Sequence, residues 1–238
     1  MSTRAAGSDL RPFRAEGVVK RFGGATALDG LTLSLAPGES LGIAGPSGSG
    51  KTTLIDIISG FVRPDAGGTW LAGREITRWP PHRIVRAGIA RTFQRPSLAG
   101  RLTVQQHLEA ATLHRRLGSQ ERRRAVNEVL DMLALGDLRA REAHTLSAGE
   151  SRRADLGRAL ATGAPVLLLD EPLASPSERG VAEILSALRR LRKEGRTMLI
   201  VAHSAVSLQT LCDRVARIEN GRIARTSRGG GGRDTRDA

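Results

Sequence analysis

The stretch Gly45-Pro46-Ser47-Gly48-Ser49-Gly50-Lys51-Thr52 decides the fold of this chain. It fits the pattern G-x-x-x-x-G-K-[ST], it follows the short apolar run Leu41 to Ala44, and it precedes residues 52–60, whose apolar spacing indicates a helix with one buried face. A phosphate-binding loop requires this order of strand, loop and helix. An ordinary glycine-rich turn is the alternative. The probability that a chain of this length matches the phosphate-loop pattern by chance is on the order of 1 in 100.

Each residue type in this loop has a part in holding a nucleotide. The glycines let backbone N–H groups surround phosphate oxygens, and the start of the following helix adds partial positive charge. Lys51 is expected to reach the β- and γ-phosphates, and Thr52 to offer its hydroxyl to Mg²⁺. We therefore expect ATP and Mg²⁺ as ligands. The residues predicted to bind ATP here are Gly45, Pro46, Ser47, Gly48, Ser49, Gly50, Lys51, Thr52 and Thr53.

Two carboxylates follow the apolar run Val166 to Leu169. A nucleotide site of this type needs an acidic group at the end of a strand to hold the Mg²⁺ shell, and Asp170 is the residue predicted for it, beside Thr52. Glu171 is placed to polarise an attacking water and to accept its proton. A pair of solvated carboxylates at a strand end is the alternative, which the upstream loop disfavours.

The order of patterns along the chain predicts an α/β fold. Residues 13–44 alternate polar and apolar side chains, which indicates short half-buried strands in an N-terminal antiparallel β region. Residues 102–161 have helical spacing and contain no strand-like run. A helix from about 177 to 193 lies between strand-like runs at 166–169 and 198–202, which favours a parallel sheet. The expected fold is a P-loop NTPase core with an inserted α-helical lobe.

Composition bounds the class of protein. With 238 residues, 39% of them hydrophobic, the chain suits one compact domain or two lobes that share a core, and its apolar runs are far shorter than the roughly 20 residues of a membrane-spanning helix. The N-terminus lacks the apolar core of a secretory signal, so we expect a cytoplasmic protein. The single cysteine, Cys212, excludes an intrachain disulfide.

The net charge of +13 requires a separate interpretation, because it is also typical of proteins that bind nucleic acid. The arginines are spread along the chain, and charge runs usually mark a solvated face. Aromatic residues make up only 3% of the chain and tyrosine is absent, which leaves few platforms for base stacking. Nucleic acid is therefore not the expected partner.

A further element lies between the loop and the carboxylates. Leu146-Ser147-Ala148-Gly149-Glu150 contains S-x-x-E, the pattern of a helix capping box. With these three elements in this order, the chain resembles the ATPase cassette of the ABC transporter family over residues 13–224. The helical lobe then covers about 97–161, an arm covers 1–12, and a Gly- and Arg-rich tail, expected to be disordered, covers 225–238.

The resemblance implies roles for further residues. LSAGE is similar to the family's signature sequence, LSGGQ, which implies that Ser147 and Gly149 face the γ-phosphate bound to a partner subunit. By resemblance, Phe22 stacks on adenine, Gln94 sits beside Mg²⁺ and water while sensing a partner, and His203 contacts the γ-phosphate. Gln94 and His203 thus join Glu171 as expected catalytic residues. The alternatives are a core aromatic, a polar loop residue and a satisfied histidine at a strand end.

The segment Gly88 to Gln94 is more similar to cassettes of branched-chain amino acid importers than to those of drug exporters. The resemblance implies an ATP-hydrolysing subunit that pairs with a second ATPase subunit, identical or different, and drives an integral membrane permease from the inner face of the membrane. A solute-binding protein is expected in the same system.

Two other functions stay open. A soluble ABC ATPase acting on nucleic acid or ribosomes would suit the basic charge, although such proteins resemble tandem cassettes in one chain. A weakly catalytic cassette that serves as a structural partner would suit the loop Ala174-Ser175-Pro176-Ser177, where family members usually have Ser-Ala-Leu-Asp or Gly-Leu-Asn.

Overall fold

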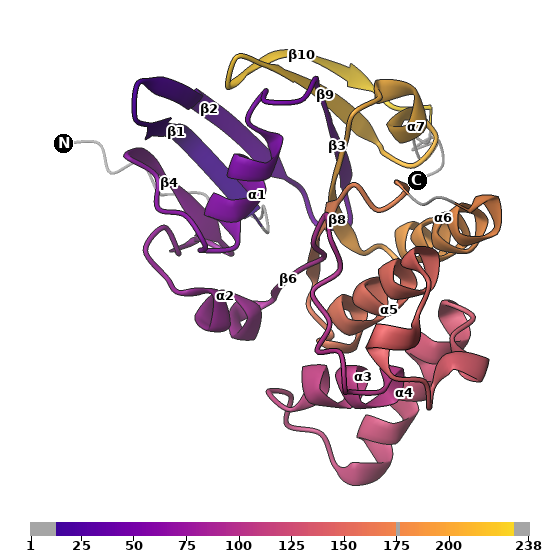
Figure 1. Cartoon of the computed structure of the whole chain (residues 1–238). Helices are drawn as coiled ribbons and strands as arrows, with labels where there is room; N and C mark the ends of the chain where they lie inside the picture. Colours follow the sequence, from indigo (N-terminus) through magenta and orange to yellow (C-terminus); the bar gives the residue numbers. More distant parts are fainter. Residues whose placement is uncertain (1–12, 175–176, 231–238) are drawn as a thin grey trace, which may run out of the picture.

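The computed structural model describes residues 13–174 and 177–230 (Figure 1). The strands are β1 (Phe13–Phe22), β2 (Ala25–Leu35), β3 (Ser40–Ala44), β4 (Ala66–Leu71), β5 (Arg74–Glu75), β6 (Ile89–Arg91), β7 (Val166–Asp170), β8 (Thr197–Ala202), β9 (Arg214–Glu219) and β10 (Arg222–Arg228). The helices are α1 (Lys51–Ile58), α2 (Pro81–Ala87), α3 (Val104–Thr112), α4 (Ser119–Met132), η1 (Gly136–Leu138), η2 (Ala143–Thr145), α5 (Ala148–Ala161), α6 (Glu178–Lys193) and α7 (Ala205–Gln209).

The strands form two sheets. One has the order β2-β1-β4-β5, with antiparallel neighbours, and it confirms the antiparallel β region expected at the N-terminus. The other has the order β10-β9-β3-β8-β7-β6, with parallel neighbours except at the edge strand β10. The predicted α/β class with a parallel sheet is therefore confirmed. The strands β4, β5 and β6, two to six residues long, were not predicted.

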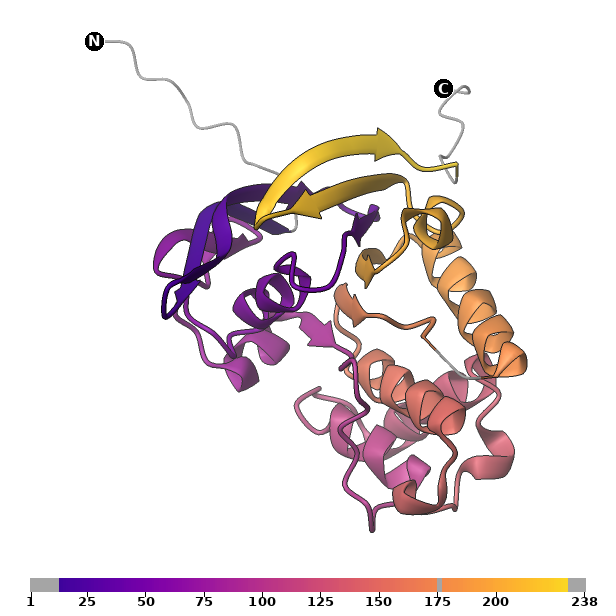
Figure 2. The same cartoon turned by 45° about the horizontal axis from the view of Figure 1, so that its top comes forward.

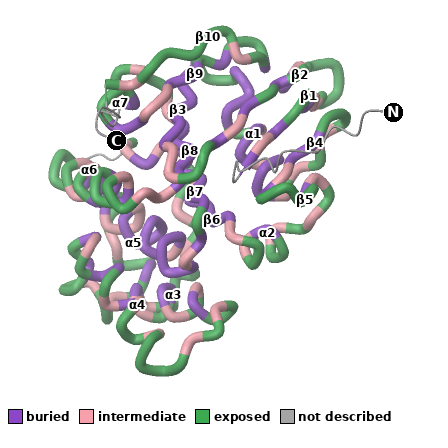
Figure 3. Tube along the Cα trace, turned by 180° about the vertical axis from the view of Figure 1, so that it is seen from behind, coloured by how far each residue is buried: buried purple, intermediate pink, exposed green. Residues whose placement is uncertain are grey.

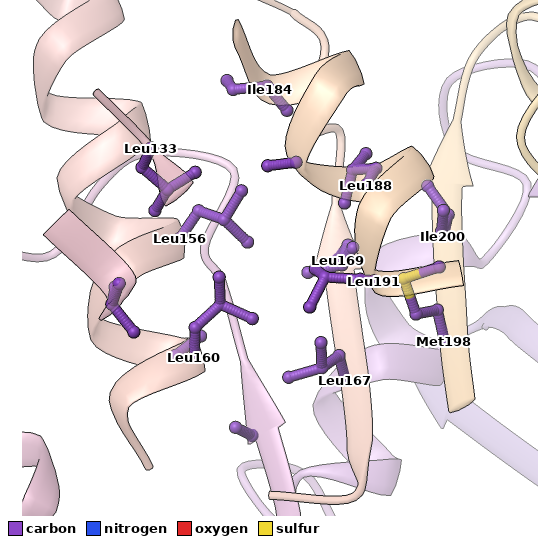
Figure 4. Close-up of a cluster of buried hydrophobic side chains, with 14 of the residues drawn as sticks. Leu133, Leu156, Leu160, Leu167, Leu169, Ile184, Leu188, Leu191, Met198 and Ile200 are labelled. Carbon is purple, nitrogen blue, oxygen red and sulfur yellow. The ribbon is translucent and has the colours of Figure 1, made fainter. Parts of the chain in front are cut away.

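The parallel sheet is buried on both faces, which explains why β7 and β8 read as continuous apolar runs. Alternate residues of β7 point to opposite sides. Val166 and Leu168 belong to one core cluster together with the apolar face of α1, whereas Leu167 and Leu169 belong to a second cluster with α5 and α6. Figure 4 shows part of the second cluster, and Figure 3 shows the buried residues gathered along the central strands.

The helical lobe lies at one end of the molecule. Figures 1 and 2 both place α3 and α4 beyond α5, and α5 contacts α3, α4 and α6. Leu133, Leu156 and Leu160 are buried between these helices and the sheet. In this way α5 joins the lobe to the sheet.

The chain ends differ in part from the expectation. The arm over residues 1–12 and residues 231–238 lie outside the described residues. The tail predicted from residue 225 is wrong for residues 225–228, because β10 continues to Arg228 and pairs with β9. Residues 225–228 are polar, but cross-strand hydrogen bonds to β9 hold them in a strand. No helix in the described part of the chain is long and apolar enough to span a bilayer.

Candidate nucleotide-binding site

The carboxyl ends of four parallel strands meet at one edge of the sheet, where α/β proteins commonly bind their ligands. The segments that follow β3, β6, β7 and β8 line a cavity of about 230 Å³ there. Its lining residues are Ala27, Ser47, Gly48, Gly50, Lys51, Thr52, Thr53, Gln94, Glu171 and His203. All of them except Ala27 were predicted, and they come from stretches far apart in the sequence.

The glycine-rich loop curls tightly between β3 and α1. Gly50 adopts a left-handed φ of 103°, and any Cβ at this position would collide with the carbonyl oxygen of Ala27. Gly48 also has a positive φ, of 76°, with open space around it. Glycine is therefore required at Gly50 by a close backbone approach, which also explains why Ala27 lines the cavity. Nothing in the sequence around Ala27 indicated that contact.

Lys51 lies over this loop. Its Nζ donates hydrogen bonds of 2.7 Å to the carbonyl oxygens of both Gly45 and Pro46. Burial lowers the pKa of Lys51, while the nearby carboxylates of Glu171 and Asp170 oppose that shift. The ammonium group is thus partly withdrawn from water at the place where phosphate oxygens would supply it with better partners.

Asp170 ends β7 and is 2% exposed. Its Oδ2 accepts no hydrogen bond from the described residues, although Arg91 Nη2 lies 3.5 Å away as an ion-pair partner. Burial raises the pKa of the Asp170 carboxyl, and the Arg91 guanidinium opposes this rise. A buried carboxylate oxygen without a hydrogen-bond donor is the kind of ligand that Mg²⁺ prefers, and Thr52, in the first turn of α1, lines the cavity at the same edge of the sheet.

Glu171 lines the cavity and contacts two of its other lining residues. His203 Nε2 is 2.6 Å from its Oε1, and Gln94 Nε2 donates a 3.4 Å hydrogen bond to its Oε2. The backbone of Glu171 has a φ of 50°, a strained value for a residue with a side chain, and its N–H bonds to Val201 O at 3.0 Å. The sheet thus holds Glu171 in a conformation that places its carboxylate between Gln94 and His203.

Phe22 and the LSAGE segment lie elsewhere. Phe22 ends β1 with 51% of its surface exposed, so the alternative that it is an aromatic packed in the core is wrong. It is not among the residues lining the cavity at the loop. Ser147 and Gly149 line a separate cavity of about 380 Å³, together with Ser177 and Gly180 at the start of α6. Within one chain, therefore, the LSAGE segment does not contribute to the cavity at Lys51.

The capping box predicted at LSAGE is confirmed. Ser147 N donates to Glu150 Oε2 at 2.7 Å, and Glu150 N donates to Ser147 Oγ at 3.3 Å, so the two residues satisfy each other's backbone groups. The backbone N–H of Ser147 lowers the pKa of the Glu150 carboxyl. Glu150, at the third position of α5, thereby fixes the first turn of the helix.

Two functional candidates near the cavity were missed. Arg91 pairs with Asp56 Oδ1 at 2.5 Å and with Asp170, and its guanidinium lies 4.7 Å from the centre of the Phe93 ring. Asp155 is 1% exposed and accepts a hydrogen bond from Phe93 N. Both were hidden because an arginine or aspartate in a helix or short strand has no local pattern that reveals a distant partner.

Comparisons with known proteins agree with this geometry. Residues 28–174 match the family model described as ABC transporter. The probable branched-chain amino acid transport ATP-binding protein LivG of Methanocaldococcus jannaschii is 32% identical over 91% of this chain and 89% of its own length. The ribose import ATP-binding protein RbsA 1 of Rubrobacter xylanophilus is 35% identical over 94% of this chain.

The match to some relatives is partial in length. This chain spans 46% of the ribose import protein and 64% of the methionine import ATP-binding protein MetN of Thermobifida fusca. A solved ATP-binding cassette of an ABC transporter in its ADP conformation superposes with a TM-score of 0.81 at 31% identity, over 92% of this chain and 91% of its own. By its matched domain, its relatives and its fold, the chain belongs to the ABC transporter family, as an ATP-binding cassette.

Proposed function

We propose that this chain is the ATP-binding and ATP-hydrolysing subunit of an ABC importer. The observation that carries the proposal is the convergence of Lys51, Glu171 and His203 at one edge of the parallel sheet, with Asp170 and Gln94 beside them. Known import ATP-binding proteins among the relatives support the same assignment.

Each side chain then has one chemical task. Lys51 binds the β- and γ-phosphates, and Glu171 orients the attacking water and accepts its proton. His203 and Gln94 hold the Glu171 carboxylate from two sides, which restricts the directions from which water can approach it. Asp170 and Thr52 would hold Mg²⁺, which supplies positive charge to the phosphate oxygens during cleavage. Phe22, exposed at the end of β1, would stack on the adenine.

The separation of LSAGE from the loop supports a head-to-tail dimer. Ser147 caps α5 and Gly149 lies in its first turn, where the N–H groups of a helix start attract an anion, yet their cavity is not that of Lys51 in the same chain. A second ATPase subunit, identical or different, would bring its own LSAGE segment to the γ-phosphate. A dimeric structure of a bacterial ABC transporter cassette, 26% identical with a TM-score of 0.83, provides a precedent.

A groove next to the site suits a permease. It has a volume of about 170 Å³, and apolar side chains dominate its walls, among them Phe61, which is 56% exposed. Its other apolar members include Ile84, Val85, Ala90 and Phe93, from α2, β6 and the segment that leads to Gln94. A short helix of an integral membrane permease would bury Phe61 there and hold the subunit at the inner face of the membrane.

The solute proposed is a branched-chain amino acid or a similar small polar compound, delivered by a solute-binding protein. The similarity to LivG favours it, whereas other relatives are named for ribose and methionine. Uptake of radiolabelled leucine by cells that lack the gene, with and without a plasmid carrying it, tests this assignment. Equal leucine uptake in the cells with and without the plasmid would contradict the assignment.

Substitution of Glu171 by Gln tests the enzymatic proposal. The amide keeps the shape of the side chain but accepts no proton, so ATP binding should persist while phosphate release falls to background. Sedimentation with ATP should then reveal a trapped dimer. Glu194→Gln, at the exposed end of α6, is the matched control. Hydrolysis at the parental rate in Glu171→Gln would overturn the role of this residue.

A further inference from the structure

One face of α5 contacts the segment that carries Gln94. Arg152 Nη2 donates to Gln94 O at 3.1 Å, and Phe93 N donates to Asp155 Oδ2 at 3.0 Å. One turn further along the helix, Arg158 Nη2 donates to Arg91 O at 3.4 Å. Residues three apart lie on the same side of a helix, so these side chains form a row that faces the backbone of residues 91–94.

Asp155 is the buried member of this row. Its carboxylate is 1% exposed, and its second oxygen accepts hydrogen bonds from Arg158 Nε at 3.1 Å and Nη2 at 2.8 Å. A buried charge is costly unless it is paired and hydrogen-bonded, and here both oxygens are engaged. The pairing of Oδ1 with Arg158 fixes the orientation of the carboxylate, so that Oδ2 is directed at the N–H of Phe93.

The contact between Asp155 and Phe93 joins two segments, α5 and residues 91–94, that belong to different parts of the proposed ATP site. Gln94, which follows Phe93 directly, donates to Glu171 Oε2. The same α5 begins at the LSAGE segment, where Ser147 is its N-cap. A continuous helix and one charged hydrogen bond therefore connect the LSAGE segment to the neighbour of Glu171.

We propose that Asp155 is a positioning residue for Gln94: through its hydrogen bond to Phe93 N, it makes Gln94 follow the movements of the LSAGE helix. The inference rests on the proposed function in that Gln94 acts beside the attacking water and Mg²⁺. A shift of the helical lobe when a partner cassette meets LSAGE would then carry Gln94 toward or away from Glu171. If the hydrogen bond between Asp155 and Phe93 N only stabilised the helical lobe, the effect of its loss on hydrolysis would not depend on Gln94.

Amide hydrogen exchange of the nucleotide-free chain tests the contact itself. In Asp155→Ala the amide of Phe93 should exchange at least about tenfold faster, because its buried acceptor is gone. Arg115→Ala is the matched control, since Arg115 Nη1 donates to Ala161 O at the other end of α5 and does not reach residues 91–94. Equal exchange of Phe93 in all three proteins would overturn the proposal.

A double-mutant cycle with Gln94→Ala tests the mechanism. Asp155→Ala should raise the Mg²⁺ concentration for half-maximal phosphate release by about fivefold, the usual size of coupling between neighbouring groups, and leave ATP affinity in EDTA unchanged. In the Gln94→Ala background, Asp155→Ala should not change the Mg²⁺ concentration for half-maximal phosphate release any further. Additive effects, or an equal loss in Arg115→Ala, would show a merely structural role and overturn the proposal.

The outcomes separate the two proposals. If Gln94→Ala alone leaves the Mg²⁺ dependence unchanged, the proposed function of Gln94 fails, whatever the exchange of Phe93. If Gln94→Ala changes the Mg²⁺ dependence, and Asp155→Ala has the same effect with and without Gln94, only the positioning role of Asp155 fails. Should Asp155→Ala not fold, Asp155→Asn keeps the volume and offers a single acceptor for Phe93 N and Arg158 together, so faster exchange at Phe93 and a smaller shift in Mg²⁺ dependence are expected from it.

Discussion

At the scale of single residues, Lys51 has the surroundings that the proposed phosphate contact needs. Its ammonium group is held by the carbonyl oxygens of Gly45 and Pro46, at 2.7 Å each, while burial lowers its pKa. Backbone carbonyls are neutral acceptors, and phosphate oxygens carry charge, so a nucleotide would offer this cation stronger hydrogen bonds than the two carbonyl oxygens do.

Replacement of Lys51 by Ala should weaken ATP binding by about a hundredfold, because charge-assisted hydrogen bonds contribute roughly 1.5–3 kcal/mol each. Titration calorimetry with ATP measures the change. Lys193→Ala, at the exposed end of α6, is the control for the loss of a positive charge alone. ATP affinity in Lys51→Ala within threefold of the parent's would contradict the role of this residue.

At the scale of elements, the ends of helices are defined locally. The side chain of Ser147 caps α5 and that of Ser177 caps α6, and in each case a backbone N–H three residues along is the donor. The end of α4 is less favourable. Ala134 follows it with a φ of 48°, so that Leu135 N can reach Leu130 O at 2.8 Å, a conformation that suits glycine.

Substitution of Ala134 by Gly should therefore raise the free energy of unfolding by about 1 kcal/mol, since a left-handed conformation costs most for residues that have a Cβ. Urea denaturation followed by circular dichroism measures it. Ala125→Gly, inside α4, should lower the same quantity by about 1 kcal/mol. A loss of stability in both variants would show that the backbone at Ala134 is not strained.

The loop between β7 and α6 contains the main departure from the usual family pattern. Ser177 accepts a 3.2 Å hydrogen bond from Gly180 N and lies in the LSAGE cavity, whereas residues 175 and 176 lie outside the described residues. Aspartate is as good an N-cap as serine and brings a charge that could hold backbone donors of a partner's loop. We expect a low basal ATPase rate from the serine.

The double change Pro176→Leu with Ser177→Asp should raise steady-state phosphate release at saturating ATP by about tenfold, the effect of one charged hydrogen bond in the closed dimer. Ser186→Asp, on the exposed face of α6, adds the same charge away from that cavity and serves as the control. If the double variant is no faster than the parent, this loop does not limit turnover.

For the whole molecule, the Lys51 cavity and the LSAGE cavity have no lining residue in common, which predicts sites shared between chains. Lys51→Ala removes the loop's cation, and Ala148→Asp places a negative charge where the γ-phosphate is proposed to bind, while remaining favourable at a helix N-terminus. Each variant alone should release phosphate at background rate.

An equimolar mixture of these two variants should recover about a quarter of the parental rate, because half of randomly assembled pairs are mixed and each has one intact site. Phosphate release after mixing, measured against each variant alone, is the observation needed. Absence of recovery would exclude shared sites between two copies of this chain.

Sequence spacing alone determined the features that depend on neighbouring residues. The glycine-rich loop, the apolar runs at 166–169 and 198–202, and the capping box at Ser147 are specified by contacts within a few residues, so their patterns are readable. The same is true of the phosphate-loop residues and of Glu171, which follow apolar runs, whereas Gln94 and His203 were expected only from the family resemblance and Ala27 was not expected.

Tertiary structure alone decided which distant segments meet. It paired the short β6 with β7, extended β10 to Arg228, placed LSAGE away from Lys51, and brought Asp155 to the backbone of Phe93. None of these has a local signature, because a three-residue strand, a polar edge strand and a buried aspartate are each unfavourable by themselves. They are stable only through partners that the folded chain supplies, and the choice of those partners depends on the packing of the whole sheet and lobe.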